Sequence, residues 1–387
     1  MNTADSEEMA QPLKERGFIA TGDIEQADVI LMNTCTVRDQ AEHRADSNIG
    51  RLRLWKDLKP NRILIVAGCA ASRWGDSIQR KYPFIDLVSP ATQMEQFPEA
   101  VATVLKERWN WNAETMAAFG SEQANKRTSE PENSHMPLLT GSLAPTFFGN
   151  QATAYVTIMR GCNLNCSYCI VPQVRGREKY RPLPDILKEI RTKVSDGYRE
   201  VMLLGQTVNS YYYRDDHVVD FADLLNAVDA IEGIERIRFM SPHPKHMRER
   251  VIAAIKECTK VARHVHLPVQ SGSDRLLERM KRLYTRDEYL ATVQKLRSAV
   301  PGIALTTDLI VGYPGETDED FQSSLSLVNT IRFNGLFAFK YSSRPGTDSA
   351  SEPDDVPDAV KEERLQKVLA LNDTIKSINS IPIAAVL

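Results

Sequence analysis

Short apolar runs alternate with longer amphipathic runs over most of the chain. In the first part, DVILMN (28–33) and RILIVAG (62–68) are β-branched apolar runs that end in turn residues, which is typical of buried parallel strands. Helical patterns are predicted for residues 37–55, 72–80 and 94–106. This alternation of strand and helix predicts an α/β domain over residues 1–108.

The two ends of this first part are less regular. A helix is predicted at 5–16 with no strand before it, although a βα unit normally begins with its strand. We therefore expect the sequence to start in the middle of such a unit. Residues 109–150 contain SEQANKRTSEPENSH, which is polar, mixed in charge and without periodicity, and they are predicted to form a linker.

Strand and helix patterns alternate again in residues 151–375. Six strands are predicted, with amphipathic helices between them. They are AYVTIM (154–159), EVMLLG (200–205), RIRFM (236–240), HVHLPV (264–269), IALTTDLIVG (303–312) and LFAFKY (336–341). Six βα repeats predict a partial (βα)6 barrel of the TIM type, open at one side because a closed barrel has eight. Such an opening would suit a large substrate.

Composition narrows the class of protein. With 387 residues, 42% hydrophobic and 26% charged, the chain can form two globular domains. No apolar run is long enough for a membrane span, so no membrane partner is expected. The net charge of −3 means that any contact with RNA must come from local basic patches. Six cysteines without a disulfide pattern favour the reducing cytoplasm.

Half of these cysteines lie in RGCNLNCSYC, as Cys162, Cys166 and Cys169. The stretch follows the first predicted barrel strand, where βα barrels carry their chemistry. A structural zinc site is one interpretation, but it needs a fourth ligand, for which only His264 or His266 could approach in space. The other interpretation is a four-iron cluster held by three thiolates, with one iron left open for a small molecule.

The spacing C-x3-C-x-aromatic-C, with Tyr168 as the aromatic, resembles the signature of the radical S-adenosylmethionine (SAM) enzymes. In that superfamily SAM chelates the open iron, and one electron cleaves it to a 5′-deoxyadenosyl radical. The resemblance thus implies a 4Fe-4S cluster on these three cysteines, with SAM as cofactor.

Longer blocks resemble the radical SAM methylthiotransferases over residues 1 to about 375. They include LLGQTVNSY, SPHP, HVHLPVQSGSDRLLERMKRLYTRDEYL, TTDLIVGYPGETDEDF and YSSRPGT. Arg160 before Gly-Cys, and the run from Arg344 to Thr347, resemble the branch that acts on tRNA. The sister branch modifies a ribosomal-protein aspartate and is the alternative. The resemblance implies 2-methylthiolation of N6-isopentenyladenosine at position 37, in the anticodon loop.

In this family the N-terminal domain is flavodoxin-like and carries a second 4Fe-4S cluster on three cysteines. Cys35 and Cys69 match two of them, and each follows a predicted parallel strand. The first family cysteine would lie before Met1, so the expectation is a sequence truncated at its start, with an incomplete second cluster. Cys258 matches no ligand and is expected in a core. The RNA-binding β-barrel of the TRAM type that usually ends the family is expected to be absent, with 376–387 as a truncated tail.

Residues other than the cysteines could contact SAM, tRNA or a metal ion. SAM contacts are predicted at the barrel rim, for Tyr168, Gly205, Gln206, Gln270, Ser271, Gly272, Gly312 and Glu316. Contacts with tRNA are predicted for the basic residues Arg175, Arg177, Lys179 and Arg344, although a charge run is often only a solvated surface. His243 and His246 could form a metal pair, but a structural role is preferred because no third ligand is in view.

The resemblance also implies partners. A flavodoxin-like or ferredoxin-like electron donor would reduce the cluster, and the protein is expected to act as a monomer. Two further alternatives stay open from the residues alone. One is a tRNA-binding protein whose clusters do not assemble, and the other is a protein stabilised by zinc.

Overall fold

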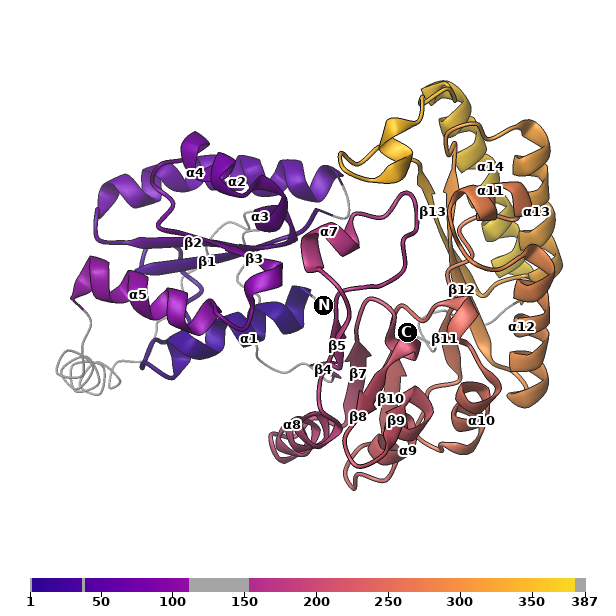
Figure 1. Cartoon of the computed structure of the whole chain (residues 1–387), viewed down its shortest axis with the longest axis horizontal. Coiled ribbons are helices and arrows are strands. Elements are labelled where there is room, and N and C mark those ends of the chain that lie inside the picture. The colour runs from indigo at the N-terminus through magenta and orange to yellow at the C-terminus, as the bar shows by residue number, and fades with distance from the viewer. Residues whose placement is uncertain (1, 37–38, 111–152, 380–387) are drawn as a thin grey trace. The chain divides into compact units, whose positions relative to one another are not determined.

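The computed structural model describes residues 2–36, 39–110 and 153–379 (Figure 1). The chain divides into two compact units, Met1–Asn150 and Gln151–Leu387. Most of the predicted linker lies outside the described residues. Its predicted start at residue 109 is one residue early, because Trp109 ends helix α5 and stacks on Phe18 with ring centroids 5.8 Å apart.

The first unit contains a parallel three-stranded sheet in the order β1-β2-β3 (Figure 1). Its strands are β1 (Val29–Thr34), β2 (Ile63–Gly68) and β3 (Leu87–Pro90). Its helices are α1 (Asn2–Lys14), α2 (Asp39–Leu58), α3 (Cys69–Trp74), α4 (Asp76–Lys81) and α5 (Phe97–Trp109), with the short 3₁₀ helix η1 (Ala91–Gln93) before α5.

Side chains of β2 alternate between two cores. Ile63 and Ile65 pack with residues of α1 and α5, whereas Leu64 and Val66 pack with residues of α2 and α4. This follows from the two-residue period of a strand that is covered by helices on both faces. It explains why β2 is apolar throughout and easy to recognise in the sequence.

Two features of the first unit differ from the sequence prediction. Strand β3 was not predicted, because it has only four residues and is partly buried. The helix predicted at 72–80 is broken at Gly75, whose φ of 50° lies in the left-handed region, so α3 and α4 are separate helices.

All six strands predicted for the second unit are present and parallel. They are β4 (Thr153–Thr157), β7 (Glu200–Leu204), β10 (Arg236–Phe239), β11 (His264–His266), β12 (Ala304–Val311) and β13 (Gly335–Lys340). Ladders give the orders β10-β7-β4 and β11-β12-β13. A bridge between Ile237 and Val261 joins these two groups. The strands therefore follow one another in sequence order. Within the described ranges no ladder joins β13 back to β4, as expected for a partial barrel.

Helices alternate with these strands (Figure 1). They are α7 (Val171–Arg175), α8 (Leu183–Ser195), α9 (Phe221–Asp229), α10 (Glu249–Glu257), α11 (Asp274–Arg279), α12 (Arg286–Ala299), α13 (Asp318–Ile331) and α14 (Asp358–Asn379). Helix α14 continues past residue 375, so the predicted start of the tail at 376 is wrong.

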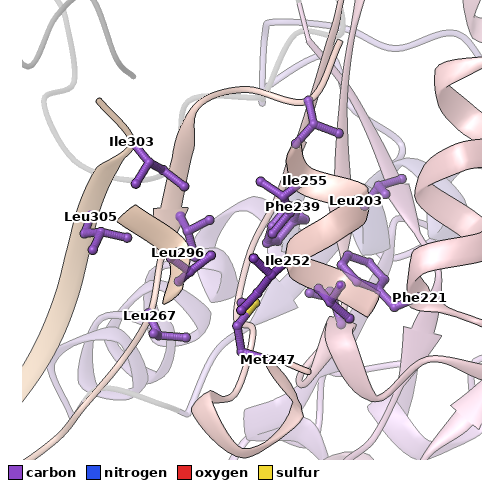
Figure 2. Packing of buried hydrophobic residues seen from close by; sticks show 14 of the residues in the cluster. Leu203, Phe221, Phe239, Met247, Ile252, Ile255, Leu267, Leu296, Ile303 and Leu305 are labelled. Atoms are coloured by element: carbon purple, nitrogen blue, oxygen red, sulfur yellow. The ribbon is translucent and has the colours of Figure 1, made fainter. Parts of the chain in front are cut away.

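The core of this unit lies between strands and helices. Figure 2 shows Leu203 and Phe239, from strands, near Phe221 and Ile252, from helices. The rings of Phe221 and Phe239 meet edge to face, with centroids 5.3 Å apart. None of the described helices is both long enough and apolar enough to cross a membrane.

Two small antiparallel hairpins were not predicted. One pairs β5 (Met159–Arg160) with β6 (Lys179–Tyr180), and the other pairs β8 (Tyr212–Arg214) with β9 (Val218–Asp220). Strands of two or three residues are too short to show a hydrophobic period. The first of these hairpins matters for the candidate site.

Candidate functional site

The three-cysteine loop leaves the carboxyl end of β4 and is closed at its base by the β5–β6 hairpin. Gly161 opens the loop with a φ of 77°, and a Cβ there would lie 2.1 Å from the carbonyl oxygen of Arg177. Only glycine permits this crossing of the chain. Next to it, the Cys162 N–H donates to the carbonyl oxygen of Gly176 at 3.1 Å.

The middle of the loop is anchored by residues that are distant in sequence. The Ser167 N–H donates to the Met280 carbonyl at 3.2 Å, and the Ser167 carbonyl accepts from the Ser349 N–H at 2.9 Å. The Ser167 hydroxyl lies 2.9 Å from the hydroxyl of Tyr313. The loop shape is therefore set by the barrel and not by the cysteines alone.

Cys162 is buried, and its sulfur has two hydrogen-bonding neighbours. The Thr207 hydroxyl, from the loop after β7, lies 3.3 Å from the sulfur, and the Leu164 N–H donates to it at 3.4 Å. Burial raises the pKa of the Cys162 thiol, and burial raises the pKa of Cys169 to about 12. Both thiols are thus protonated at neutral pH unless a positive group such as a metal stabilises the thiolates.

Arg282 contacts Cys166 from the loop between α11 and α12. Its Nη1 donates to the Cys166 sulfur at 3.4 Å and to the Tyr168 hydroxyl at 3.3 Å. Its Nη2 donates to the Pro268 carbonyl at 3.0 Å, and its Nε donates to the Tyr284 hydroxyl at 3.0 Å. Every nitrogen of this buried guanidinium therefore has a fixed partner, which makes its position well defined.

His243 lies in the loop after β10, beside Tyr284, with ring centroids 5.6 Å apart. Two hydrogen bonds join the Asn209 side chain to the backbone of His243. The His243 N–H donates to Asn209 Oδ1, and Asn209 Nδ2 donates to the His243 carbonyl oxygen. Burial lowers the pKa of His243 to about 2, so the imidazole is neutral at all ordinary pH values. Its ring lies 5.9 Å from that of His246.

The predicted rim residues lie in the loops that follow four strands, β4, β7, β11 and β12. Gly205 and Gln206 follow β7, and a Cβ on Gly205 would lie 2.5 Å from Met159 Cγ, so glycine is required for packing. The side-chain oxygen of Gln206 is buried and has no hydrogen-bond partner among the described residues. The Tyr168 hydroxyl accepts a hydrogen bond from Arg282, so this side chain already has a partner within the protein.

The other rim residues have clear structural roles. Gln270 has a φ of 75° and pairs through its backbone with β12. Ser271 lies 3.5 Å from Ser324 between the hydroxyl oxygens, and a Cβ on Gly272 would lie 2.5 Å from Ser324 Cα, so this turn packs against α13.

Gly312 and Glu316 form a second turn after β12. The Glu316 carboxylate accepts from the Gly312 N–H at 2.6 Å and from Arg364 of α14 at 2.7 Å. Burial raises the pKa of Glu316 against these two contacts. Its other oxygen is buried and has no hydrogen-bond partner among the described residues.

The predicted basic residues differ in exposure. Arg177 and Lys179 are exposed, whereas Arg175 and Arg344 are buried. Arg181 is partly buried and pairs with Glu189 at 2.6 Å. Arg177 and Lys179 are therefore the two of these side chains that are open to solvent.

Cys35 and Cys69 of the first unit follow neighbouring strands. Thr34 at the end of β1 is paired with Gly68 at the end of β2, so the two cysteines leave the same sheet edge side by side. Gly68 has a φ of 97°, and a Cβ there would lie 2.5 Å from the Thr34 carbonyl oxygen. The backbone register therefore places the starts of these two loops next to each other.

The described residues contain no group of three or more His, Cys, Asp or Glu side chains that could hold a metal ion. His264 and His266 both bond to Thr306 at 3.0 Å and do not complete a zinc site. A single zinc ion needs its ligands within about 2.3 Å of one point, whereas a four-iron cluster spreads its thiolates over separate irons. Three cysteines on one loop with N–H donors fit the cluster.

Cys258 lies outside this site, as expected. It is buried in the barrel core, its sulfur donates to the Asn226 side chain at 3.2 Å, and burial raises its pKa to about 11.

Comparison with known proteins identifies the family. Residues 156–328 match the radical SAM superfamily, and residues 1–90 match a family described as the uncharacterized protein family UPF0004. The tRNA-2-methylthio-N(6)-dimethylallyladenosine synthase of Syntrophus aciditrophicus is 43% identical, over 96% of this chain and 77% of that protein. The synthase of the same name from Clostridium tetani is 43% identical, over 95% and 78%. This chain belongs to that family of synthases.

Solved structures agree with the fold of this family member. The radical SAM methyltransferase TsrM from Kitasatospora setae has a TM-score of 0.64 at 14% identity, covering 90% of this chain and 74% of that one. The cobalamin-dependent radical SAM enzyme OxsB has a TM-score of 0.54 at 13% identity, covering 96% and 53%. The predicted fold class is thereby confirmed.

Several residues of the site were missed by reasoning on the sequence. Thr207, Arg282 and Tyr284 all lie within blocks that carried the family resemblance, but no role was assigned to them. The only available signal was their position just after barrel strands or in the long block that contains HVHLPVQSGSD.

Proposed function

We propose that this protein is a radical SAM-dependent tRNA methylthiotransferase, which converts N6-isopentenyladenosine at position 37 of tRNA to its 2-methylthio derivative. The supporting observation is the three-cysteine loop at the carboxyl end of β4 in a chain 43% identical to synthases named for this reaction. The ribosomal-protein alternative has no such support, because the relatives compared above are named for tRNA.

The chain's own residues would hold and orient the reactants. Cys162, Cys166 and Cys169 would ligate the 4Fe-4S cluster that radical SAM enzymes carry, while Thr207 and Arg282 keep two of the sulfurs in place. When bound and reduced, such a cluster would supply the one electron needed for reductive cleavage of SAM. A C–H bond on an aromatic ring has no acid–base handle, so radical chemistry suits the reaction.

SAM would lie along the strand ends. The free carboxylate oxygen of Glu316 and the free amide oxygen of Gln206 are acceptors available to it. The adenosine must be unstacked to reach this site, which an anticodon loop allows more readily than a duplex. Arg177 and Lys179 would contact its phosphates.

A second cluster on Cys35 and Cys69 would provide the sulfur that is transferred. These are the two cysteines of residues 1–150, so the sequence as given supplies two of the three thiolates that the family uses. We expect the enzyme to work as a monomer in the cytoplasm, with a flavodoxin-like or ferredoxin-like protein as electron donor.

The test is an assay on anaerobically reconstituted protein with SAM, a chemical reductant and tRNA that contains isopentenyladenosine. Mass spectrometry of the digested nucleosides should show the methylthio product, and the separate changes C162A, C166A and C169A should abolish it. C258S is the matched control, because that cysteine is buried outside the site. Methylthiolation of a ribosomal protein instead of tRNA, or a preparation without iron and sulfide, would contradict the proposal.

A further inference from the structure

Arg282 is a buried cation without an anionic amino-acid partner. Its side chain lies inside the barrel unit, with a relative exposure of 5%. Its described partners are two tyrosine hydroxyls, one carbonyl oxygen and the Cys166 sulfur, and none is a carboxylate. A buried charge that is hydrogen-bonded but not neutralised is costly.

The surroundings do not supply the missing negative charge. His243, which lies close to Arg282, is neutral because burial lowers its pKa to about 2. The Arg282 guanidinium lies 5.3 Å from the centre of the Tyr284 ring, a favourable but weak contact for a cation.

The remaining candidate for a countercharge is the sulfur of Cys166, at 3.4 Å from Nη1. As a free thiol it carries no charge, but as an iron ligand it is a thiolate. A cation and an N–H donor at a ligating sulfur stabilise the more negative, reduced form of a cluster, which raises the reduction potential.

Resting on the proposed function, we propose that Arg282 is a positioning residue that carries the countercharge of the iron–sulfur site and raises the reduction potential of the cluster held by Cys162, Cys166 and Cys169. Pro268 and Tyr284 fix the guanidinium through Nη2 and Nε, and Nη1 is directed at the Cys166 sulfur. The cost of burying the charge is then offset when the thiolate forms.

The experiment is a redox titration of the full-length chain followed by electron paramagnetic resonance, without SAM. Cys35 and Cys69 are first replaced by alanine, so that any signal comes from the barrel cluster. R282Q removes the charge, R282K keeps it, and R297Q removes one exposed arginine elsewhere as a matched control. Iron content and far-ultraviolet circular dichroism are measured on each variant.

We expect R282Q to lower the reduction equilibrium constant at least tenfold, which is a fall of about 59 mV for one electron. R282K should keep most of the parent potential, and R297Q should not change it. Loss of iron in R282Q but not in R282K would also support the countercharge, because Lys keeps the positive charge although it cannot reproduce the guanidinium geometry.

Two results would overturn the inference. They are equal potentials in the parent and R282Q, and equal loss of iron in R282Q and R282K. Absence of iron in the parent with Arg282 intact would instead count against the proposed function, so the two failures are distinguishable.

Discussion

At the scale of single residues, sequence spacing predicted the ligands but not their surroundings. Cys162, Cys166 and Cys169 share one loop, so their spacing is visible in the sequence itself. Arg282 is 116 residues from Cys166, and Thr207 is 45 residues from Cys162. Such contacts exist only after the barrel strands align, and no local pattern marks them.

Gly161 provides a test of the loop geometry. G161A would place a methyl group 2.1 Å from the Arg177 carbonyl at a φ of 77°, so the crossing at the base of the loop must open. We expect G161A to bind much less iron on anaerobic reconstitution, measured as iron per chain.

Gly302 is the matched control for this change. It has the same φ of 77°, but a Cβ there would meet nothing within 4 Å. G302A therefore introduces the backbone strain, of order 1 kcal/mol, without the clash. Equal iron content in G161A and G302A would mean that the crossing is not needed for the cluster site.

At the scale of elements, strand existence was predictable and short hairpins were not. Strand β2 and the six barrel strands are short apolar runs that alternate with helical segments along the chain. Because parallel strands of this kind are buried on both faces, they appear in the sequence as nearly continuous apolar runs. The β5–β6 hairpin has two residues on each side, and its position is decided by the glycine crossing and not by a hydrophobic period. In the turn after β12, the Thr317 side chain caps α13.

The attachment of α14 to that turn gives a second prediction. Arg364 of α14 binds the buried carboxylate of Glu316 at 2.7 Å and also reaches Asp318. R364A would leave Glu316 buried without its cation, which typically costs about 3–5 kcal/mol. Urea denaturation should therefore show a large fall in the free energy of unfolding.

Two further variants make this prediction specific. K367A removes the exposed ion pair with Glu363 on the same helix and should change stability by less than about 0.5 kcal/mol. The double change E316Q/R364M removes both charges and should recover part of the loss. If K367A lowered the free energy of unfolding as much as R364A, any substitution on helix α14 would be destabilising, and the effect could not be assigned to the buried Arg364–Glu316 pair.

At the scale of the whole molecule, a net charge of −3 gives the chain little general attraction for RNA. Binding of tRNA must then depend on a few local cations, of which Arg177 and Lys179 are exposed near the cysteine loop. Overall composition could exclude a strongly basic RNA-binding protein, but it could not identify these positions as open to solvent.

The salt dependence of tRNA binding tests this view. If Arg177 and Lys179 each contact one phosphate of a single-stranded loop, R177A/K179A should reduce the slope of log K against log salt by about 1.4. Fluorescence anisotropy with labelled tRNA at several salt concentrations measures it. R191A/K193A, on α8, is the control pair, and an equal change for both pairs would mean that only net charge matters.

The hairpin at the base of the cysteine loop has a consequence for the binding of a cluster. Because the β5–β6 pairing and the anchors on Ser167 hold the loop through protein contacts, part of the conformational entropy of ordering it is lost when the chain folds. Binding of a cluster would then have to order less of the chain than it would on a loop held by its cysteines alone.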